Sequence, residues 1–119
     1  MLVIRQEKMD VLQEHAEEDF VKRVMNYLRK EQDAETYQLN DEELRERVKF
    51  GIEKARSYYL TWEQPIGLFV QLMFSISPNF DRQENINTVL TEIYEEPNEK
   101  MDYLWDETSD DDWEEAAIL

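Results

Sequence analysis

Residues 61–76, with the sequence TWEQPIGLFVQLMFSI, contain the most apolar stretch of this 119-residue chain. Apolar residues recur there at steps of three and four, which is the spacing of one helix face, and others fall on the remaining sides. The first face carries Ile66, Phe69, Val70, Met73 and Phe74, and the other sides carry Leu68, Leu72 and Ile76. A helix that is apolar almost all round must be covered by other elements. We therefore expect a central core helix, because crossing a membrane takes about twenty apolar residues.

The segments on either side show the amphipathic pattern of helices that would cover this central helix. Apolar residues at steps of three and four predict three such helices, over residues 6–30, 41–59 and 82–95. A short fifth helix is predicted around Met101, Leu104 and Trp105. Residues 30–40 lose the helical period, and we expect a loop there that Tyr37 and Leu39 attach to the body.

Local signals mark where these helices begin. Asn40 and Thr61 each stand three residues before a Glu or Gln, which is the spacing of a capping box. Asp81 is the expected cap of the 82–95 helix. Gly51 lies inside the 41–59 helix, where glycine costs about 1 kcal/mol relative to alanine. Either a close helix crossing or simple tolerance would account for a glycine at that position.

These patterns predict an all-α protein, a single-domain bundle of four main helices plus a short fifth, with an acidic C-terminal tail. The helical domain is expected over residues 1–105 and the tail over residues 106–119. Two glycines and three prolines are few for a β fold rich in turns. The chain has no cysteine, which excludes disulfides and thiolate metal sites. No signal-peptide pattern is visible, so we expect a cytoplasmic protein.

The net charge of −16 is unevenly distributed. Residues 57–119 contain 15 acidic residues and only two basic ones, Arg82 and Lys100. A nucleic-acid-binding protein would carry the opposite sign, and an anionic membrane surface would repel this chain. A basic protein partner is the natural complement, while a general gain in solubility is the alternative interpretation.

The acidic excess is densest in residues 106–119, which contain seven acids and no base. Such a block is usually disordered and often binds a partner. Trp113 stands among these acids and would give a partner an apolar side chain to hold; the alternative is that it folds back on the body. We expect the partner-binding residues to be Asp106, Glu107, Asp110, Asp111, Asp112, Trp113, Glu114 and Glu115.

The sequence contains no recognisable set of catalytic or cofactor-binding residues. We therefore expect a protein that is not an enzyme and binds no cofactor or metal. His15, the only histidine, lies near Glu14, Glu18 and Asp19. Two ligands on a solvated helix face fall short of the three or four that a metal site needs. The sequence contains no glycine-rich phosphate loop and no serine in the context of a nucleophile elbow.

Several stretches together resemble a family of small bacterial proteins encoded beside type VI secretion spike, PAAR-tip and effector genes. The resemblance covers about residues 3–94 and depends on order and spacing rather than on one distinctive motif. Tyr59 departs from it, since a small residue, usually glycine, is expected there. The resembling stretches are IRQEKM at residues 4–9, Phe20, YLR at 27–29, GIEKARSY at 51–58, LMF at 72–74 and FD at 80–81.

The resemblance implies a non-enzymatic partner of a secreted toxin or of its delivery apparatus. We expect a cognate immunity protein that binds a basic effector toxin and blocks its active site. An acidic helical protein can occupy a cleft that normally binds nucleic acid. Small acidic colicin immunity proteins are an analogy for this kind of inhibition. The alternative is an adaptor or chaperone that loads an effector onto the secretion spike and leaves its activity intact.

Overall fold

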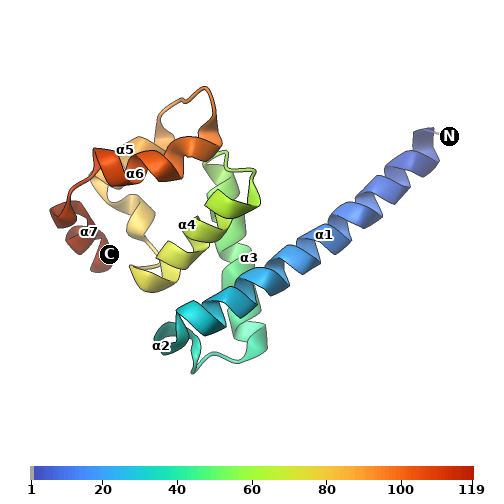
Figure 1. Ribbon diagram of the computed structural model, residues 1–119, viewed down its shortest axis with the longest axis horizontal. Coiled ribbons are helices and arrows are strands. Elements are labelled where there is room, and N and C mark those ends of the chain that lie inside the picture. The colour runs from blue at the N-terminus through green and yellow to red at the C-terminus, as the bar shows by residue number, and fades with distance from the viewer. Residues whose placement is uncertain (1) are drawn as a thin grey trace.

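All regular elements in the described part of the chain are helices (Figure 1). The computed structural model describes the backbone of residues 2–119 and the side chains of residues 16–119. The α-helices are α1 (Leu2–Glu31), α2 (Asp33–Thr36), α3 (Asp41–Ser57), α4 (Glu63–Ser75), α5 (Glu84–Thr91), α6 (Lys100–Glu107) and α7 (Asp110–Ala117). Two 3₁₀ turns, η1 (Phe80–Arg82) and η2 (Pro97–Glu99), precede α5 and α6. The expected all-α class is confirmed, while α2 and α7 are helices that the sequence pattern did not predict.

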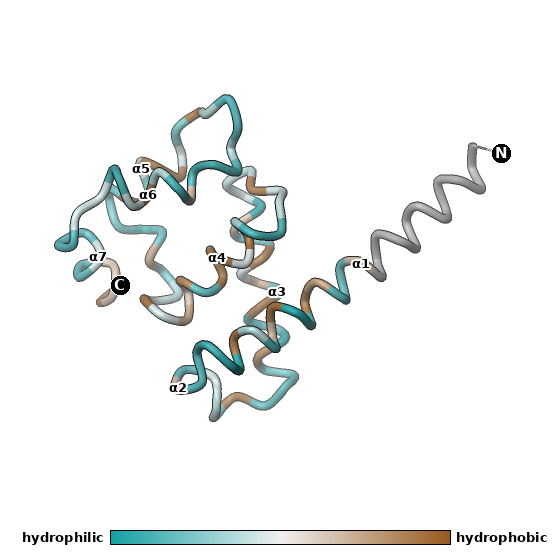
Figure 2. The backbone as a smooth tube through the Cα atoms, in the orientation of Figure 1, coloured by the Kyte–Doolittle hydropathy of each residue, from teal (hydrophilic) through white to brown (hydrophobic). Residues whose placement is uncertain are grey.

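Helix α4 forms the centre of the core, as its sequence predicts. It lies between α1 and α6 in Figure 1 and packs most extensively on α3. Its buried residues are Pro65, Ile66, Phe69, Val70, Leu72 and Met73. Figure 2 shows hydrophobic residues concentrated along α4, whereas the connection between α5 and α6 is mostly hydrophilic. No helix within the described chain is long and apolar enough to cross a membrane.

A close crossing of α3 and α4 explains the glycine inside α3. A Cβ atom built on Gly51 would lie 3.0 Å from Val70 Cγ2 and 3.1 Å from Met73 Sδ. The missing side chain therefore lets the two helices approach at this point. The expected capping box at the start of α3 is also present, because Asn40 Oδ1 accepts from the Glu43 amide and Glu43 Oε1 accepts from the Asn40 amide.

The connection between α1 and α3 contains α2 rather than an irregular loop. Thr36 is buried, whereas Tyr37 is 65% exposed and does not attach the segment to the body. Leu39 does attach it, as expected, because it is partly buried against the core. Arg29 adds a second attachment, since its guanidinium donates to the carbonyl oxygens of Thr36 and Leu39 and pairs with Asp41. An apolar pattern does not reveal this charged contact.

The starts of α4 and α5 differ from the expected caps. Thr61 forms no capping box: α4 begins at Glu63, after Trp62, which makes no side-chain cap. Asn98 instead holds the residues just before the helix, because its Oδ1 accepts from the Thr61 and Trp62 amides, each at 2.8 Å. Asp81 is not the cap of α5 either. Gln83 caps that helix through the Ile86 amide, and α5 ends at Thr91 rather than near residue 95.

Candidate functional site

The acidic C-terminal segment, residues 106–119, is folded onto the body. It contains the end of α6 and all of α7. Ser109 caps α7 in a reciprocal capping box, because Ser109 Oγ accepts from the Asp112 amide and Asp112 Oδ2 accepts from the Ser109 amide. This Ser-x-x-Asp spacing is the local signal in the sequence that marks the helix. The composition of the segment, which favours disorder, is outweighed by this cap and by apolar contacts to the core.

Trp113 makes most of those contacts. Its ring is stacked on Phe80 with centroids 6.1 Å apart and on Trp105 with centroids 5.3 Å apart, and Phe80 is fully buried. Its Nε1 donates to Thr108 Oγ1 at 2.9 Å. Ala116, one turn further on, is also buried. Trp113 is thus half-buried in the protein itself, and only part of its ring is available to a partner.

Asp112 ties α7 to the start of α5. Its Oδ1 accepts hydrogen bonds from Gln83 Nε2 at 3.1 Å and Asn85 Nδ2 at 2.9 Å. The hydrogen bond from the Ser109 amide is the largest of the interactions that hold the pKa of this carboxyl below its ordinary value. Two of the expected partner-binding residues, Asp112 and Trp113, therefore stabilise the fold. The other six are exposed: Asp106, Glu107, Asp110, Asp111, Glu114 and Glu115.

The exposed acids continue beyond the predicted segment, across the α5–α6 connection. Ten exposed carboxylates lie between residues 92 and 115. The only base in that range is Lys100, which is 2% exposed. Its ammonium donates to the carbonyl oxygens of Tyr58 and Leu90, each at 2.8 Å, and burial lowers its pKa. The surface formed by residues 92–115 therefore presents negative charge and no exposed base of its own. We call it the acidic face and define it by residues 92–115.

Exposed aromatic rings lie within the acidic face and beside it. Trp105 is 52% exposed and lies at the outer end of its stack with Trp113. Tyr103 is stacked on Tyr94 with centroids 5.1 Å apart. Tyr59, from the α3–α4 turn, is 73% exposed and lies over the Lys100 ammonium. The sequence pattern does not reveal this group, because Tyr59, Tyr94 and Tyr103 come from three different segments of the chain.

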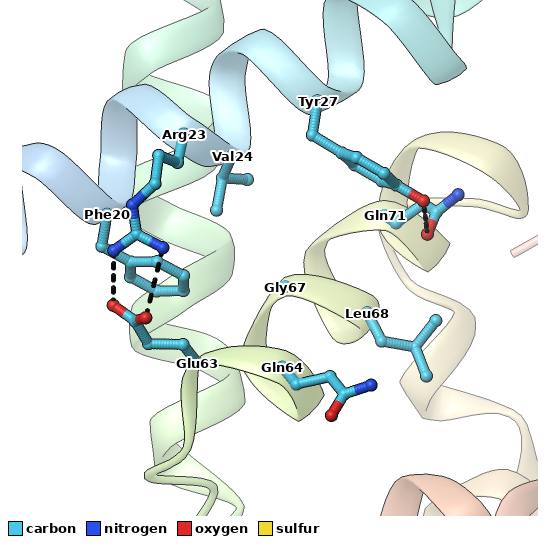
Figure 3. A pocket seen from close by; sticks show the side chains of 9 residues that line it. All are labelled: Phe20, Arg23, Val24, Tyr27, Glu63, Gln64, Gly67, Leu68 and Gln71. Carbon is cyan, nitrogen blue, oxygen red and sulfur yellow. Dashed lines mark hydrogen bonds and ion pairs between the residues drawn. The ribbon is translucent and has the colours of Figure 1, made fainter.

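A cleft of about 540 Å³ separates α1 from α4 (Figure 3). Arg23 bridges it at one end through two hydrogen bonds to Glu63, and Tyr27 donates to Gln71 at the other end. A Cβ at Gly67 would meet no atom within 4 Å, so this part of the α4 wall is open. The charged residues of the lining, Arg23 and Glu63, pair with each other.

Buried polar groups near η1 form a closed structural cluster. Asp81, 2% exposed, pairs with the Lys54 ammonium at 2.7 Å through Oδ1 and accepts from the Tyr58 hydroxyl at 2.7 Å through Oδ2. Burial, together with Asp81, raises the pKa of Tyr58, so this hydroxyl remains a donor at neutral pH. The cluster fixes η1 against α3, because Asp81 contacts two side chains of that segment, Lys54 through an ion pair and Tyr58 through a hydrogen bond.

The described residues contain no group of three or more His, Cys, Asp and Glu side chains placed to hold a metal ion. His15 lies outside the residues whose side chains are described. In comparisons with known proteins, no family model matches the chain, and no curated protein or solved structure is significantly similar to it.

Proposed function

We propose that this chain is a non-enzymatic acidic binding protein, and specifically a cytoplasmic immunity protein that binds and neutralises a type VI secretion effector toxin. The observation that carries the proposal is the acidic face, which has ten exposed carboxylates and exposed aromatic rings and whose single base is buried. Aromatic side chains supply much of the binding energy in protein interfaces, and complementary charge speeds the encounter.

The sign and density of the charge favour a basic partner. A toxin that acts on nucleic acid needs a positive cleft for the phosphate backbone, and a rigid set of carboxylates on helices α6 and α7 can occupy such a cleft in its place. The resemblance to proteins encoded beside secretion effectors supports the same choice of partner. We expect no nucleic acid, membrane or cofactor to bind at this face.

An adaptor that loads an effector onto the secretion spike is the alternative function. The cleft between α1 and α4 favours it, because this partly apolar surface is built from elements outside the acidic face and could hold a non-catalytic effector segment. The two functions differ in their effect on the toxin. An immunity protein abolishes the effector's activity on binding, whereas an adaptor binds and leaves that activity unchanged.

The test uses purified proteins encoded by the genes adjacent to this one. Wild type is compared with a variant carrying Asp106→Asn, Asp110→Asn, Asp111→Asn and Glu114→Gln, whose side chains make no hydrogen bond or ion pair within the described chain. A control carries Glu31→Gln, Glu35→Gln, Glu42→Gln and Glu53→Gln, which gives the same net charge from exposed acids elsewhere. Circular dichroism confirms that all three proteins are folded.

We expect an effector to bind wild type and the control with association rates that fall as salt rises, because ions screen the acidic face. The variant neutralised on the acidic face should bind about tenfold more slowly and lose protection of toxin-expressing cells. Equal loss in both variants would show that only total charge matters, and no loss in either would refute the acidic face as the binding surface.

A further inference from the structure

Tyr59 has a backbone conformation that an L-residue adopts at a cost. Its φ of 68° makes it the only non-glycine residue with positive φ in the described chain. It follows the C-cap of α3, and its amide donates to the Arg56 carbonyl while the Leu60 amide donates to the Ala55 carbonyl. This is the Schellman arrangement, and its left-handed position is usually glycine because a Cβ crowds the following carbonyl there.

The fold gains little from the tyrosine side chain. The ring is 73% exposed, and its hydroxyl makes no hydrogen bond to any residue that the structure describes. The Lys100 ammonium lies 5.4 Å from its ring centroid. Lys100 already donates to two carbonyl oxygens and has the Tyr94 ring 6.0 Å away. A strained, exposed aromatic residue with so little internal role indicates a role toward a partner.

Two other tyrosines lie near Tyr59. The Tyr59 and Tyr94 rings lie near the same ammonium, and Tyr94 is stacked on Tyr103 with an interplanar angle of 13°. We call these three residues the tyrosine face. Figure 1 shows the α3–α4 turn beside the loop that leads into α6. Tyr59 and Tyr103 are the exposed rings of this face, and Tyr94 is partly buried against the core.

Carboxylates are hydrogen-bonded into the tyrosine face itself. Tyr94 donates to Glu92 at 3.2 Å, and Tyr103 donates to Glu99 at 3.4 Å. Burial and the Glu92 carboxylate raise the pKa of Tyr94 to about 12, so the ring stays neutral. Both glutamates are exposed and keep further acceptor sites. The face thus combines aromatic surfaces with carboxylate acceptors at its edge.

We propose that the tyrosine face binds arginine side chains of a basic protein partner, an inference that depends on the proposed function. A guanidinium is planar and weakly hydrated, so it stacks on tyrosine while it donates two hydrogen bonds to a carboxylate. A lysine ammonium is a point charge that gains less from the same surface. Lys100 does not block an incoming guanidinium, because it is buried and its ammonium donates to two carbonyl oxygens at helix ends.

The test measures binding of poly-arginine and poly-lysine peptides of equal length to the full chain by titration calorimetry. Wild type should bind both in a salt-dependent manner and poly-arginine more tightly. Tyr59→Gly should raise the thermal midpoint by about 3–6 °C, since it relieves the strained backbone. The same substitution should weaken poly-arginine binding about tenfold and poly-lysine binding less. Tyr37→Ala is the matched control, because Tyr37 is also exposed but lies outside the acidic half.

The outcomes separate the two proposals. If wild type binds neither peptide, the proposed function fails and the inference fails with it. If both peptides bind and Tyr59→Gly is more stable but binds poly-arginine as wild type does, the tyrosine face is refuted while the acidic binding function remains. Equal affinity of wild type for the two peptides would also overturn the assignment to arginine.

Discussion

Lys100 shows how one buried charge links three helices. It is the first residue of α6, and its ammonium donates to the Tyr58 carbonyl at the end of α3 and to the Leu90 carbonyl in the last turn of α5. Helix C-termini carry partial negative charge and unpaired carbonyls, so two of them together can hold an ammonium without a carboxylate. Removing the ammonium leaves both carbonyls without this donor.

We therefore predict that Lys100→Met lowers the free energy of unfolding by at least about 2 kcal/mol, because each buried carbonyl left unpaired costs about 1–3 kcal/mol. Urea denaturation measures the loss. Lys49→Met is the control, since Lys49 is exposed and makes no hydrogen bond or ion pair within the described chain. It should change the stability by less than about 0.5 kcal/mol. Equal losses in the two variants would contradict the double-carbonyl role.

The lowered pKa of Asp112 predicts how the stability of α7 depends on pH. Its pKa is lowered from the ordinary 3.8, first by the Ser109 amide and then by Asn85, so the folded chain binds a proton less tightly than the unfolded chain. The contribution of Asp112 to the free energy of unfolding is therefore complete at pH values above its ordinary pKa. It is lost progressively as the pH falls through the lowered value of the folded state.

We predict that Asp112→Asn flattens the acid side of the stability–pH curve. Denaturation should be followed through the near-ultraviolet circular dichroism of the Trp105–Trp113 stack, which reports directly on α7. Asp111→Asn, one residue away on the exposed side, should leave the acid dependence as in wild type. A curve for Asp112→Asn that is parallel to that of wild type would show that this carboxyl is not the group responsible.

At the scale of elements, the two glycines of the chain form a matched pair on facing helices. Alanine at Gly51 would place its Cβ 3.0 Å from Val70 Cγ2, whereas alanine at Gly67 would meet open space. Both changes gain about 1 kcal/mol of helix propensity. We predict a gain of about that size for Gly67→Ala and none for Gly51→Ala, where crowding offsets it. Thermal or urea denaturation compares the stability of each variant with wild type. A Gly51→Ala variant that is more stable than wild type would disprove the tight crossing.

Helix α7 should behave as part of the fold and not as a detachable tail. Trp113→Ala removes two stacking contacts and one hydrogen bond, and we predict a loss of about 1–3 kcal/mol, less than for a fully buried tryptophan. Trp62→Ala is the control, because Trp62 is 54% exposed and makes no stacking contact within the described chain. If Trp113→Ala is as mild as Trp62→Ala, the interpretation as a tail for binding alone would stand.

The central helix and the Asn40 cap could be predicted because the responsible residues are neighbours in the sequence. The α4 core positions follow a period of 3.6 residues, and the capping box spans three residues. The failures involve partners far apart in the chain. Asn98 accepts from the amide of Thr61, 37 residues earlier, and Trp113 contacts Phe80 and Trp105 through tertiary packing. Local composition predicts disorder for residues 106–119 because it contains no information about those contacts.

The strain at Tyr59 could not be predicted for the same reason. Its position on the apolar stripe of α3 predicts a buried side chain, but the helix ends at Ser57 and the chain reverses at Tyr59. The exposed surface therefore depends on where the helix stops. The acidic excess itself was evident from composition, whereas the rings that lie within it and beside it were brought together by the fold.

At the scale of the whole molecule, charge attracts α1 to its neighbouring helices and is repulsive on the surface of α5, α6 and α7. Arg23 pairs with Glu63, Arg29 with Asp41, Arg45 with Glu18 and Arg56 with Glu17. Each of these pairs joins α1 to another helix. The only other ion pair between elements of the described chain is the buried one between Lys54 and Asp81. Attraction thus helps to hold α1, whereas α5, α6 and α7 carry a surface of like charges.

This division predicts opposite effects of salt on the two halves. Raising NaCl from about 0.05 to about 0.5 M shortens the screening length to a few ångströms, which weakens both exposed ion pairs and surface repulsion. Hydrogen–deuterium exchange should therefore become faster for the amides of residues 20–28 in α1 and slower for those of α6 and α7. The Arg56→Gln variant, which lacks one α1 pair, should show faster α1 exchange already at low salt and a smaller further change. A uniform response of all helices would mean that apolar packing alone sets the local stability and that the charge division has no energetic consequence for the fold.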